Sequence, residues 1–217
     1  MEINNLFQAA GIVAWPLVGF SLVSVALILE RLWFWTKINR RQPRLARELL
    51  KLYQKDPDLA LHRLRRNSDL PLARIFLEAL ELNRPTPEEF RLALESASQA
   101  EIPLLNRSAT VFETIISVSP LLGLLGTILG LMTSFSALKI GQMGEENTVA
   151  VTGGISEALV STVMGLVVAI FTLLFANLFR GFYRRQLALI QEYGGQLELL
   201  YRRKDRKGDS YNYASTR

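Results

Sequence analysis

Residues 155–175 read ISEALVSTVMGLVVAIFTLLF, an apolar run that is long enough to form a membrane-spanning helix. About 20 helical residues cross the roughly 30 Å of hydrocarbon in a bilayer. One carboxylate, Glu157, lies in the first turns of this run. An ionisable side chain inside a bilayer helix costs about 2.5–3.5 kcal/mol on insertion scales, so Glu157 either lies at the headgroups or is kept for a function.

Two further runs have a similar length, so the chain has three in all, at residues 9–29, 115–138 and 155–179. The mean hydropathy is +0.19 although the chain holds 25 Lys and Arg residues, because apolar and basic residues occupy separate segments. The first run has no basic leader and is followed by Glu30 and Arg31, so we expect it to stay in the protein rather than to be removed as a signal peptide. These patterns predict an all-α membrane protein with three transmembrane helices.

The positive charges are distributed very unequally around the three runs. Residues 1–29 contain no Lys or Arg, and the loop between the second and third runs contains only Lys139. All other Lys and Arg residues fall in 30–112 or after residue 179. Because Lys and Arg stay on the cytoplasmic side of membrane segments, we expect the N-terminus outside and the C-terminus inside.

Between the first and second runs, charged residues alternate with apolar residues at helical spacing, which predicts a cytoplasmic helical domain. Asp56 before Pro57 indicates a helix start, and Thr86 with Glu89 forms a capping-box pattern. We expect helix breaks at 67–71 and 83–85, cytoplasmic extensions of the second and third membrane helices, and a disordered tail at 202–217. The predicted segments are an external amphipathic lead (1–8), the first membrane helix with its inner anchor (9–35), the cytoplasmic domain (36–109), the second membrane helix (110–138), an external loop (139–154) closed by Thr152 as a helix cap, the third membrane helix (155–179), and a cytoplasmic helix extension with a basic tail (180–217).

The composition argues against several classes of function. The chain has no Cys, and its single histidine, His62, lies among arginines, so neither a thiolate site nor a histidine metal site is expected. No nucleophile–base set or phosphate-binding loop can be assembled, so we expect neither an enzyme nor a cofactor. The net charge of +5 comes from Lys and Arg residues that flank the membrane helices. Membrane topology and contact with anionic lipid explain these residues better than nucleic-acid binding does.

The second run separates small residues from bulky ones. At about 100° per residue, its small and hydroxylated residues fall within an arc of roughly 140°. Small residues at this spacing let helices approach closely, so for this face taken by itself we favour packing over a function. The face consists of Ser119, Pro120, Gly123, Gly126, Thr127, Gly130, Thr133, Ser134 and Ala137.

The third run repeats this division beside Glu157. Two neighbouring small faces bordered by a carboxylate could pass protons, because hydroxyls and the waters that they hold can relay a proton to an acid. The same faces would serve hydrated ions, or helix packing alone, and spacing does not separate these three readings. The small face of the third run consists of Ala158, Ser161, Thr162, Gly165, Ala169, Thr172 and Ala176.

Two segments, SPLLGLLGTILG at 119–130 and GISEALVSTVMGLVVAI at 154–170, resemble the ExbB and TolQ proteins, which are relatives of the flagellar stator protein MotA. The resemblance extends over almost the whole chain and is closer to ExbB. It implies a homopentamer in the inner membrane around the membrane helices of a smaller partner, ExbD or TolR, whose membrane aspartate also titrates. Such complexes use the proton motive force to drive TonB or TolA. Three rather than four membrane helices argue against the flagellar stator.

The resemblance also implies site residues. Glu157, Thr127 and Thr162 match the acidic and two threonine positions that line the proton path in this family. Five further residues either line the same proton path or serve only helix packing, namely Ser161, Thr172, Ser134, Gly126 and Gly130. Two alternatives remain open, namely a TolQ-type subunit of the Tol-Pal envelope system and, in a different class, a non-conducting membrane scaffold.

The sequence departs from the family pattern in the third helix. Phe171 stands where members commonly have proline, and Ala176 before Asn177 stands where they have tyrosine. We therefore expect an uninterrupted helix in this region. Glu113, at the inner edge of the second helix, is an additional acid, for which we favour pairing with an arginine over an inward extension of the path.

Overall fold

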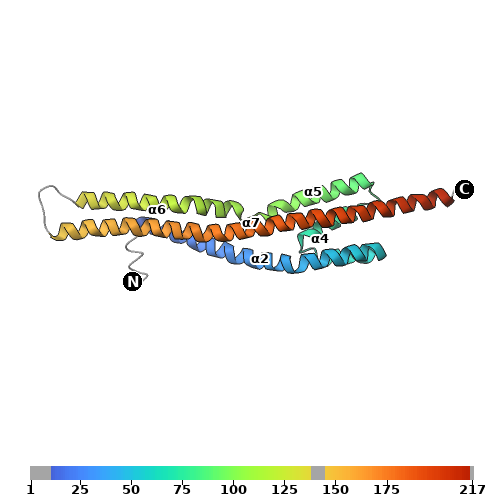
Figure 1. Ribbon diagram of the computed structural model, residues 1–217, viewed down its shortest axis with the longest axis horizontal. Helices are drawn as coiled ribbons and strands as arrows, with labels where there is room; N and C mark the ends of the chain where they lie inside the picture. Colours follow the sequence, from blue (N-terminus) through green and yellow to red (C-terminus); the bar gives the residue numbers. More distant parts are fainter. Residues whose placement is uncertain (1–10, 138–144, 216–217) are drawn as a thin grey trace. The chain divides into compact units, whose positions relative to one another are not determined.

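A computed structural model describes residues 11–137 and 145–215, without the side chains of residues 11, 137, 145–151, 157 and 207–215. Every regular element in these ranges is helical, which confirms the all-α prediction (Figure 1). The predicted N-terminal lead at 1–8 lies outside the described residues. The elements are the short 3₁₀ helix η1 (Gly11–Val13) and the α-helices α2 (Ala14–Lys55), α3 (Pro57–Arg65), α4 (Pro71–Leu80), α5 (Pro87–Leu105), α6 (Ala109–Ala137) and α7 (Glu145–Ser215).

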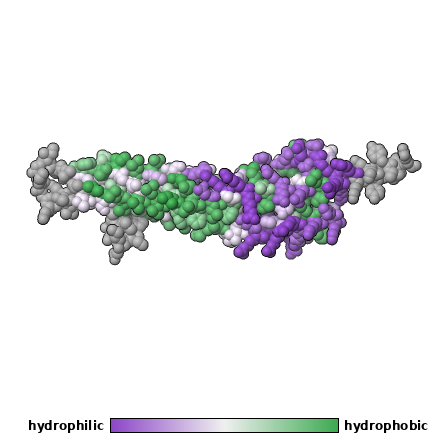
Figure 2. All heavy atoms as spheres, viewed as in Figure 1, coloured by the Kyte–Doolittle hydropathy of each residue, from purple (hydrophilic) through white to green (hydrophobic). Residues whose placement is uncertain are grey.

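The chain divides into two compact units. The first, which we call the apolar unit, comprises the chain up to Arg31 and Ser108–Phe179. The second, the charged unit, comprises Leu32–Arg107 and the chain from Arg180 onward. Three helical stretches are long and apolar enough to cross a membrane, at Ala14–Lys55, Pro87–Ser136 and Thr152–Arg206. Figure 2 shows green, apolar side chains gathered on the first unit and purple, hydrophilic ones on the second.

In the apolar unit, the glycines of α6 and Ser134 point inward, as the helical wheel predicted, but Thr133 of the predicted small face is exposed. Gly123, Gly126, Gly130 and Ser134 are buried on α6. Large apolar side chains cover the opposite side, where a bilayer or a neighbouring subunit would contact them. Those at least 37% exposed are Leu121, Leu124, Leu125, Ile128, Leu129, Leu131, Met132 and Phe135.

Helix α7 begins ten residues earlier than the apolar run predicted, at Glu145. Residues 138–144 lie outside the described residues, but 145–154 are helical, so Thr152 lies inside the helix and its predicted role as a cap is wrong. The Gly153–Gly154 pair suggested a loop because glycine disfavours helices. A Cβ added at Gly154 would come 2.8 Å from the carbonyl oxygen of Gly130, so this glycine instead permits close packing with α6.

The helices continue further than their composition suggested. α2 runs without a break from the apolar residues through Pro43 to Lys55, although the sequence changes character at Thr36. α7 passes through Phe171 and on to Ser215, which confirms the uninterrupted helix. The prediction of a disordered tail is therefore wrong for residues 202–215, the part of the tail that the structure describes. In contrast, a turn at 106–108 separates α5 from α6, so the extension of the second membrane helix is a helix of its own.

The predicted helix starts in the charged unit are confirmed. Asp56 caps α3 by accepting hydrogen bonds from two backbone N–H groups of the first turn. Thr86 and Glu89 form the capping box at the start of α5. The predicted breaks correspond to the connections between α3 and α4 and between α4 and α5. Between these breaks, α4 buries most of its surface, including Phe76.

Polar side chains connect the helices of the charged unit. Arg74 of α4 holds Glu101 of α5 through two hydrogen bonds of 2.5 and 2.6 Å, and Glu101 is buried. Such bidentate, charge-assisted pairs fix both the distance and the orientation of two helices. The hydrogen bonds with Glu101 raise the pKa of Arg74 above its usual range. On α7, the ring of Tyr201 stacks on Phe90 of α5 with centroids 4.2 Å apart.

Candidate functional site

Helices α6 and α7 approach each other closely along their small residues. A Cβ added at Gly165 of α7 would come 2.5 Å from the carbonyl oxygen of Ser119, and one at Gly130 of α6 would come 3.0 Å from the Cβ of Ala158. No ordinary side chain fits at such distances without a shift of backbone. We call this contact the seam, and its members are Ser119, Gly123, Gly126, Gly130 and Ser134 on α6 and Gly154, Ala158, Ser161 and Gly165 on α7.

The seam brings the two predicted threonines to the same level of the bundle. Thr162 donates a hydrogen bond across the seam to the carbonyl oxygen of Gly123, at 3.2 Å. Thr127 donates to the carbonyl oxygen of Leu124, at 2.6 Å. The acceptors are consecutive carbonyls of one helical turn. Both threonines are half-buried, so they lie at the edge of the seam rather than at its centre.

Each of these hydroxyls keeps some hydrogen-bonding capacity. A hydroxyl has one donor and two acceptor positions. Thr127 and Thr162 each donate to a carbonyl, which leaves their oxygens able to accept from a water or from another acid. Edge hydroxyls with spare acceptors can therefore take part in a chain of hydrogen bonds that continues beyond the seam.

Two other hydroxyls of the small faces, those of Ser134 and Ser161, are buried and serve helix contacts. Ser161 is fully buried. Its hydroxyl oxygen lies 2.8 Å from the carbonyl oxygen of Ala158 in the same helix and 3.3 Å from the carbonyl oxygen of Gly123 on α6. Ser134 is 2% exposed and donates to the Gly130 carbonyl at 3.0 Å. A Cβ at Gly126 would clash with the side chain of Ser161. This geometry favours packing over conduction for these seam residues.

Thr172 lies on a different contact. Its hydroxyl is 2.7 Å from the hydroxyl of Ser24 on α2, and both residues are buried. Since Thr172 also donates to the Val168 carbonyl, Ser24 is the donor in the pair. The pair therefore joins the first and third membrane helices and does not reach the α6–α7 seam.

A match to the family model of MotA/TolQ/ExbB proton channels covers residues 67–192, more than half of the chain and all of the seam. The chain belongs to the MotA/TolQ/ExbB proton channel family. This match confirms the resemblance to ExbB and TolQ that the sequences of the second and third membrane helices indicated. The seam of this ExbB-like chain lies within the matched region.

Named relatives agree with this assignment. An ExbB-like biopolymer transport protein of Synechocystis sp. is 64% identical over 210 residues, which span 97% of this chain and 100% of the relative. Biopolymer transport protein ExbB of Salmonella typhimurium is 33% identical over 123 residues, 57% of this chain and 50% of the relative. The Tol-Pal system protein TolQ of Haemophilus influenzae is 40% identical over 78 residues, 36% of this chain and 33% of the relative.

The two acids of the ExbB-like membrane helices are placed differently. Glu157 lies on α7, four residues before Ser161, but its side chain is outside the part of the chain that the structure describes. Glu113 is exposed on α6, four residues after the first helical residue. The expected arginine partner of Glu113 stays a prediction.

Two polar contacts of the apolar unit were missed by the sequence reasoning. Ser24 was read as part of an apolar run, although it pairs with Thr172 from a position 148 residues away. Arg31 is only 4% exposed, and its Nε donates to Ser108 at 2.9 Å. Two features of the sequence could have indicated these contacts: a lone serine between apolar residues, and an arginine at the end of a membrane run. Neither indicates which residue will be the partner.

Proposed function

We propose that this chain is the proton-conducting motor subunit of an energy-transducing complex in the inner membrane. It would assemble as a homopentamer around a single-helix subunit of the ExbD or TolR type, with the charged unit in the cytoplasm. The observation that carries the proposal is the position of Thr127 and Thr162 on consecutive α6 carbonyls at the edge of the seam. Glu157 precedes Thr162 on α7, in a chain of a proton channel family.

In this mechanism the carboxyl of Glu157 takes up a proton from the outer side and releases it when the surroundings of the group change. The hydroxyls of Thr127 and Thr162 accept hydrogen bonds from waters that connect this carboxyl with the aspartate of the partner helix. Rotation or displacement of the partner then alternates which side is hydrated. The rigid seam holds α6 and α7 at a fixed separation while the partner moves.

The system served is proposed from the relatives. Their ExbB names favour a TonB-type complex that energises transport across an outer membrane, and the TolQ match keeps a Tol-Pal role as the alternative. A non-conducting scaffold is the candidate of a different class. It is favoured by the glycines of the seam, whose close contacts need no conduction to explain them.

A single experiment separates conduction from scaffolding. We expect Glu157→Gln, in a complex with its partner in liposomes, to lower proton flux by about 100-fold or more because the titrating group is lost. Thr127→Val and Thr162→Val should each lower the flux by about 3–10-fold, the worth of one hydrogen bond. Flux is measured with a pH-sensitive dye under an imposed membrane potential.

Thr114→Val is the matched control, since Thr114 is an exposed α6 threonine that bonds its own helix at the Thr110 carbonyl. It should leave the flux unchanged. If Glu157→Gln conducts normally, the proton role is wrong. If the threonine variants instead fail to assemble with the partner, as judged by size-exclusion chromatography, the scaffold is the better description.

A further inference from the structure

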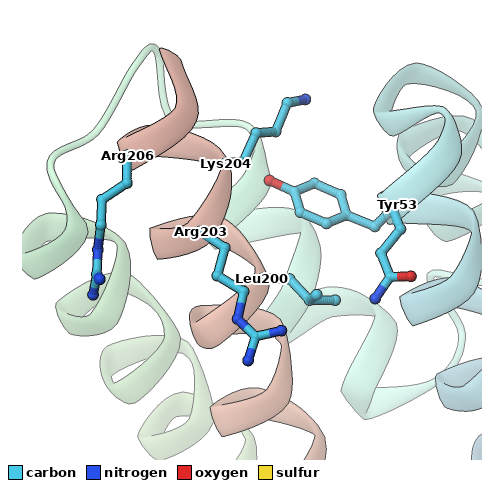
Figure 3. Close-up of a pocket in the computed structure, with 6 residues that line it drawn as sticks. Tyr53, Leu200, Arg203, Lys204 and Arg206 are labelled. Carbon is cyan, nitrogen blue, oxygen red and sulfur yellow. The ribbon is translucent and has the colours of Figure 1, made fainter. Parts of the chain in front are cut away.

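The charged unit contains an open pocket of about 630 Å³ between the end of α2 and α7. Tyr53 and Gln54 line it from α2, and Leu200, Arg203, Lys204 and Arg206 line it from α7. Figure 3 shows the Tyr53 hydroxyl directed toward α7 and the three basic side chains extending from neighbouring turns of that helix. The described lining therefore holds three cations and no carboxylate.

Within the described part of the chain, the three cations of the pocket differ from the neighbouring Arg202 in having no acidic partner. Arg202 forms ion pairs with Glu88 and Glu198, at 3.2 and 2.9 Å. Among the described residues, no carboxylate lies within salt-bridge distance of Arg203, Lys204 or Arg206. Arg203 and Arg206 are neighbours on the helix surface at spacing i, i+3, where like charges repel. An anion in the pocket would remove this repulsion.

The wall from α2 supplies neutral hydrogen-bond donors. The Lys204 Nζ lies over the Tyr53 ring, 5.7 Å from its centroid. Burial, and then the nearby Tyr201, raise the pKa of Tyr53 to about 12, so its hydroxyl stays protonated at neutral pH and can donate. The amide of Gln54 is exposed and adds two more donor hydrogens.

We propose that this pocket binds a phosphate-bearing anion. The pocket lining offers two planar guanidinium groups and one ammonium on α7, with a phenol and an amide on α2, and these are donors of the kind that recognise phosphate oxygens. Both a phospholipid headgroup and a soluble phosphate compound present this chemistry. The site lies within the charged unit, apart from the seam, and does not depend on proton conduction.

The test uses the full chain in nanodiscs and follows acylation of single lysines by mass spectrometry. In nanodiscs of zwitterionic lipid, pyrophosphate should protect Lys204 saturably, compared with NaCl of equal ionic strength. In nanodiscs that contain phosphatidylglycerol, protection without pyrophosphate identifies the headgroup as the source. In the zwitterionic nanodiscs, Lys37, which pairs with Asp69 at 3.0 Å, is the internal control and should react equally with and without pyrophosphate.

Arg203→Gln combined with Arg206→Gln should raise the concentration that gives half-protection by about tenfold or more, because two charge-assisted hydrogen bonds are lost. Arg63→Gln with Arg65→Gln is the matched control, since both arginines are exposed and already paired with Glu48 and Glu81. Equal protection in the two double variants would overturn the proposal, as would no saturable protection of Lys204. Protection by a polyglutamate peptide but by neither phosphate source would assign the pocket to an acidic protein segment and would also overturn it.

Discussion

At the scale of single residues, position within the seam decides what a small or hydroxylated side chain can do. Ser161 is fully buried and uses its hydroxyl on carbonyls of both helices. Thr162, the next residue, is half-buried and makes one contact across the seam. Neighbouring residues of similar chemistry therefore divide into one that holds helices together and one that remains accessible to a partner.

The glycines give the first prediction at this scale. Gly165→Ala should destabilise the protein by about 1–3 kcal/mol, because the new methyl group meets the backbone carbonyl of Ser119 and overpacks the contact. The measurement is the thermal midpoint of helix loss in detergent, followed by circular dichroism. Gly194→Ala is the control, since a Cβ there meets nothing within 4 Å. That change should stabilise the protein by about 0.5–1 kcal/mol through the higher helix propensity of alanine. Equal midpoints for the two variants would show that the seam is not tightly packed.

At the scale of helices, the sequence predicted starts better than lengths. Asp56 and Thr86 identified two helix starts because a cap is a local interaction among residues two or three apart. The length of α2 was missed at Thr36 because a change from apolar to charged residues marks a change of surroundings and not the end of backbone hydrogen bonding. The same distinction explains why the basic residues at 202–206 are helical.

The candidate site was predictable to a similar degree. The helical wheel placed Gly126, Gly130 and Ser161 on small faces, and the structure brings these faces together. It could not show that Thr172 faces α2. A helical wheel gives the angular position of each residue around one helix but does not show which helix packs against each side. Long-range pairs such as Arg31 with Ser108 have no local pattern at all.

The connection between α3 and α4 gives a prediction that belongs to this scale. Asp69 accepts from Arg41 of α2 at 2.6 Å and lies 3.0 Å from the Lys37 Nζ, so it holds the connection to α2. Burial alone would raise the pKa of Asp69, but the hydrogen bonds and charges of Lys37 and Arg41 outweigh it and lower the pKa below its usual value. The contact therefore stabilises the folded state above the unfolded pKa of about 3.9 and is lost as the pH falls through the lower, folded pKa.

Wild-type protein should accordingly lose stability between pH 5 and pH 3 by somewhat more than Asp69→Asn does, with a difference under about 1 kcal/mol because the group is partly exposed. Urea unfolding of the protein in detergent at a series of pH values measures this difference. Glu95→Gln, on the surface of α5, is the control for a general loss of negative charge. If the stability of Asp69→Asn and that of the wild type follow the same pH dependence, the contacts of Asp69 with Lys37 and Arg41 contribute nothing to the stability of the folded state.

At the scale of the whole molecule, the distribution of charge predicts the orientation of the chain in the membrane. The apolar unit carries three membrane-length helical stretches, and nearly all Lys and Arg residues fall in the charged unit. Translocating those charges across a bilayer is far less favourable than translocating the nearly uncharged loop between α6 and α7. The proposed proton uptake from outside requires this orientation, so it can be tested first.

Because the chain contains no cysteine, single cysteines can report the orientation directly. Gly153→Cys, at an exposed position near the start of α7, should react with a membrane-impermeant maleimide added to intact spheroplasts. Arg66→Cys, exposed at the end of α3, should react only after the membrane is permeabilised, because the positive-inside rule retains its surroundings in the cytoplasm. Labelling of both residues before permeabilisation would mean that the charged unit is accessible from outside the membrane, which would contradict the predicted orientation. The reverse pattern would invert the chain and place the proposed proton entry, Glu157, on the cytoplasmic side, which contradicts uptake driven by the proton motive force.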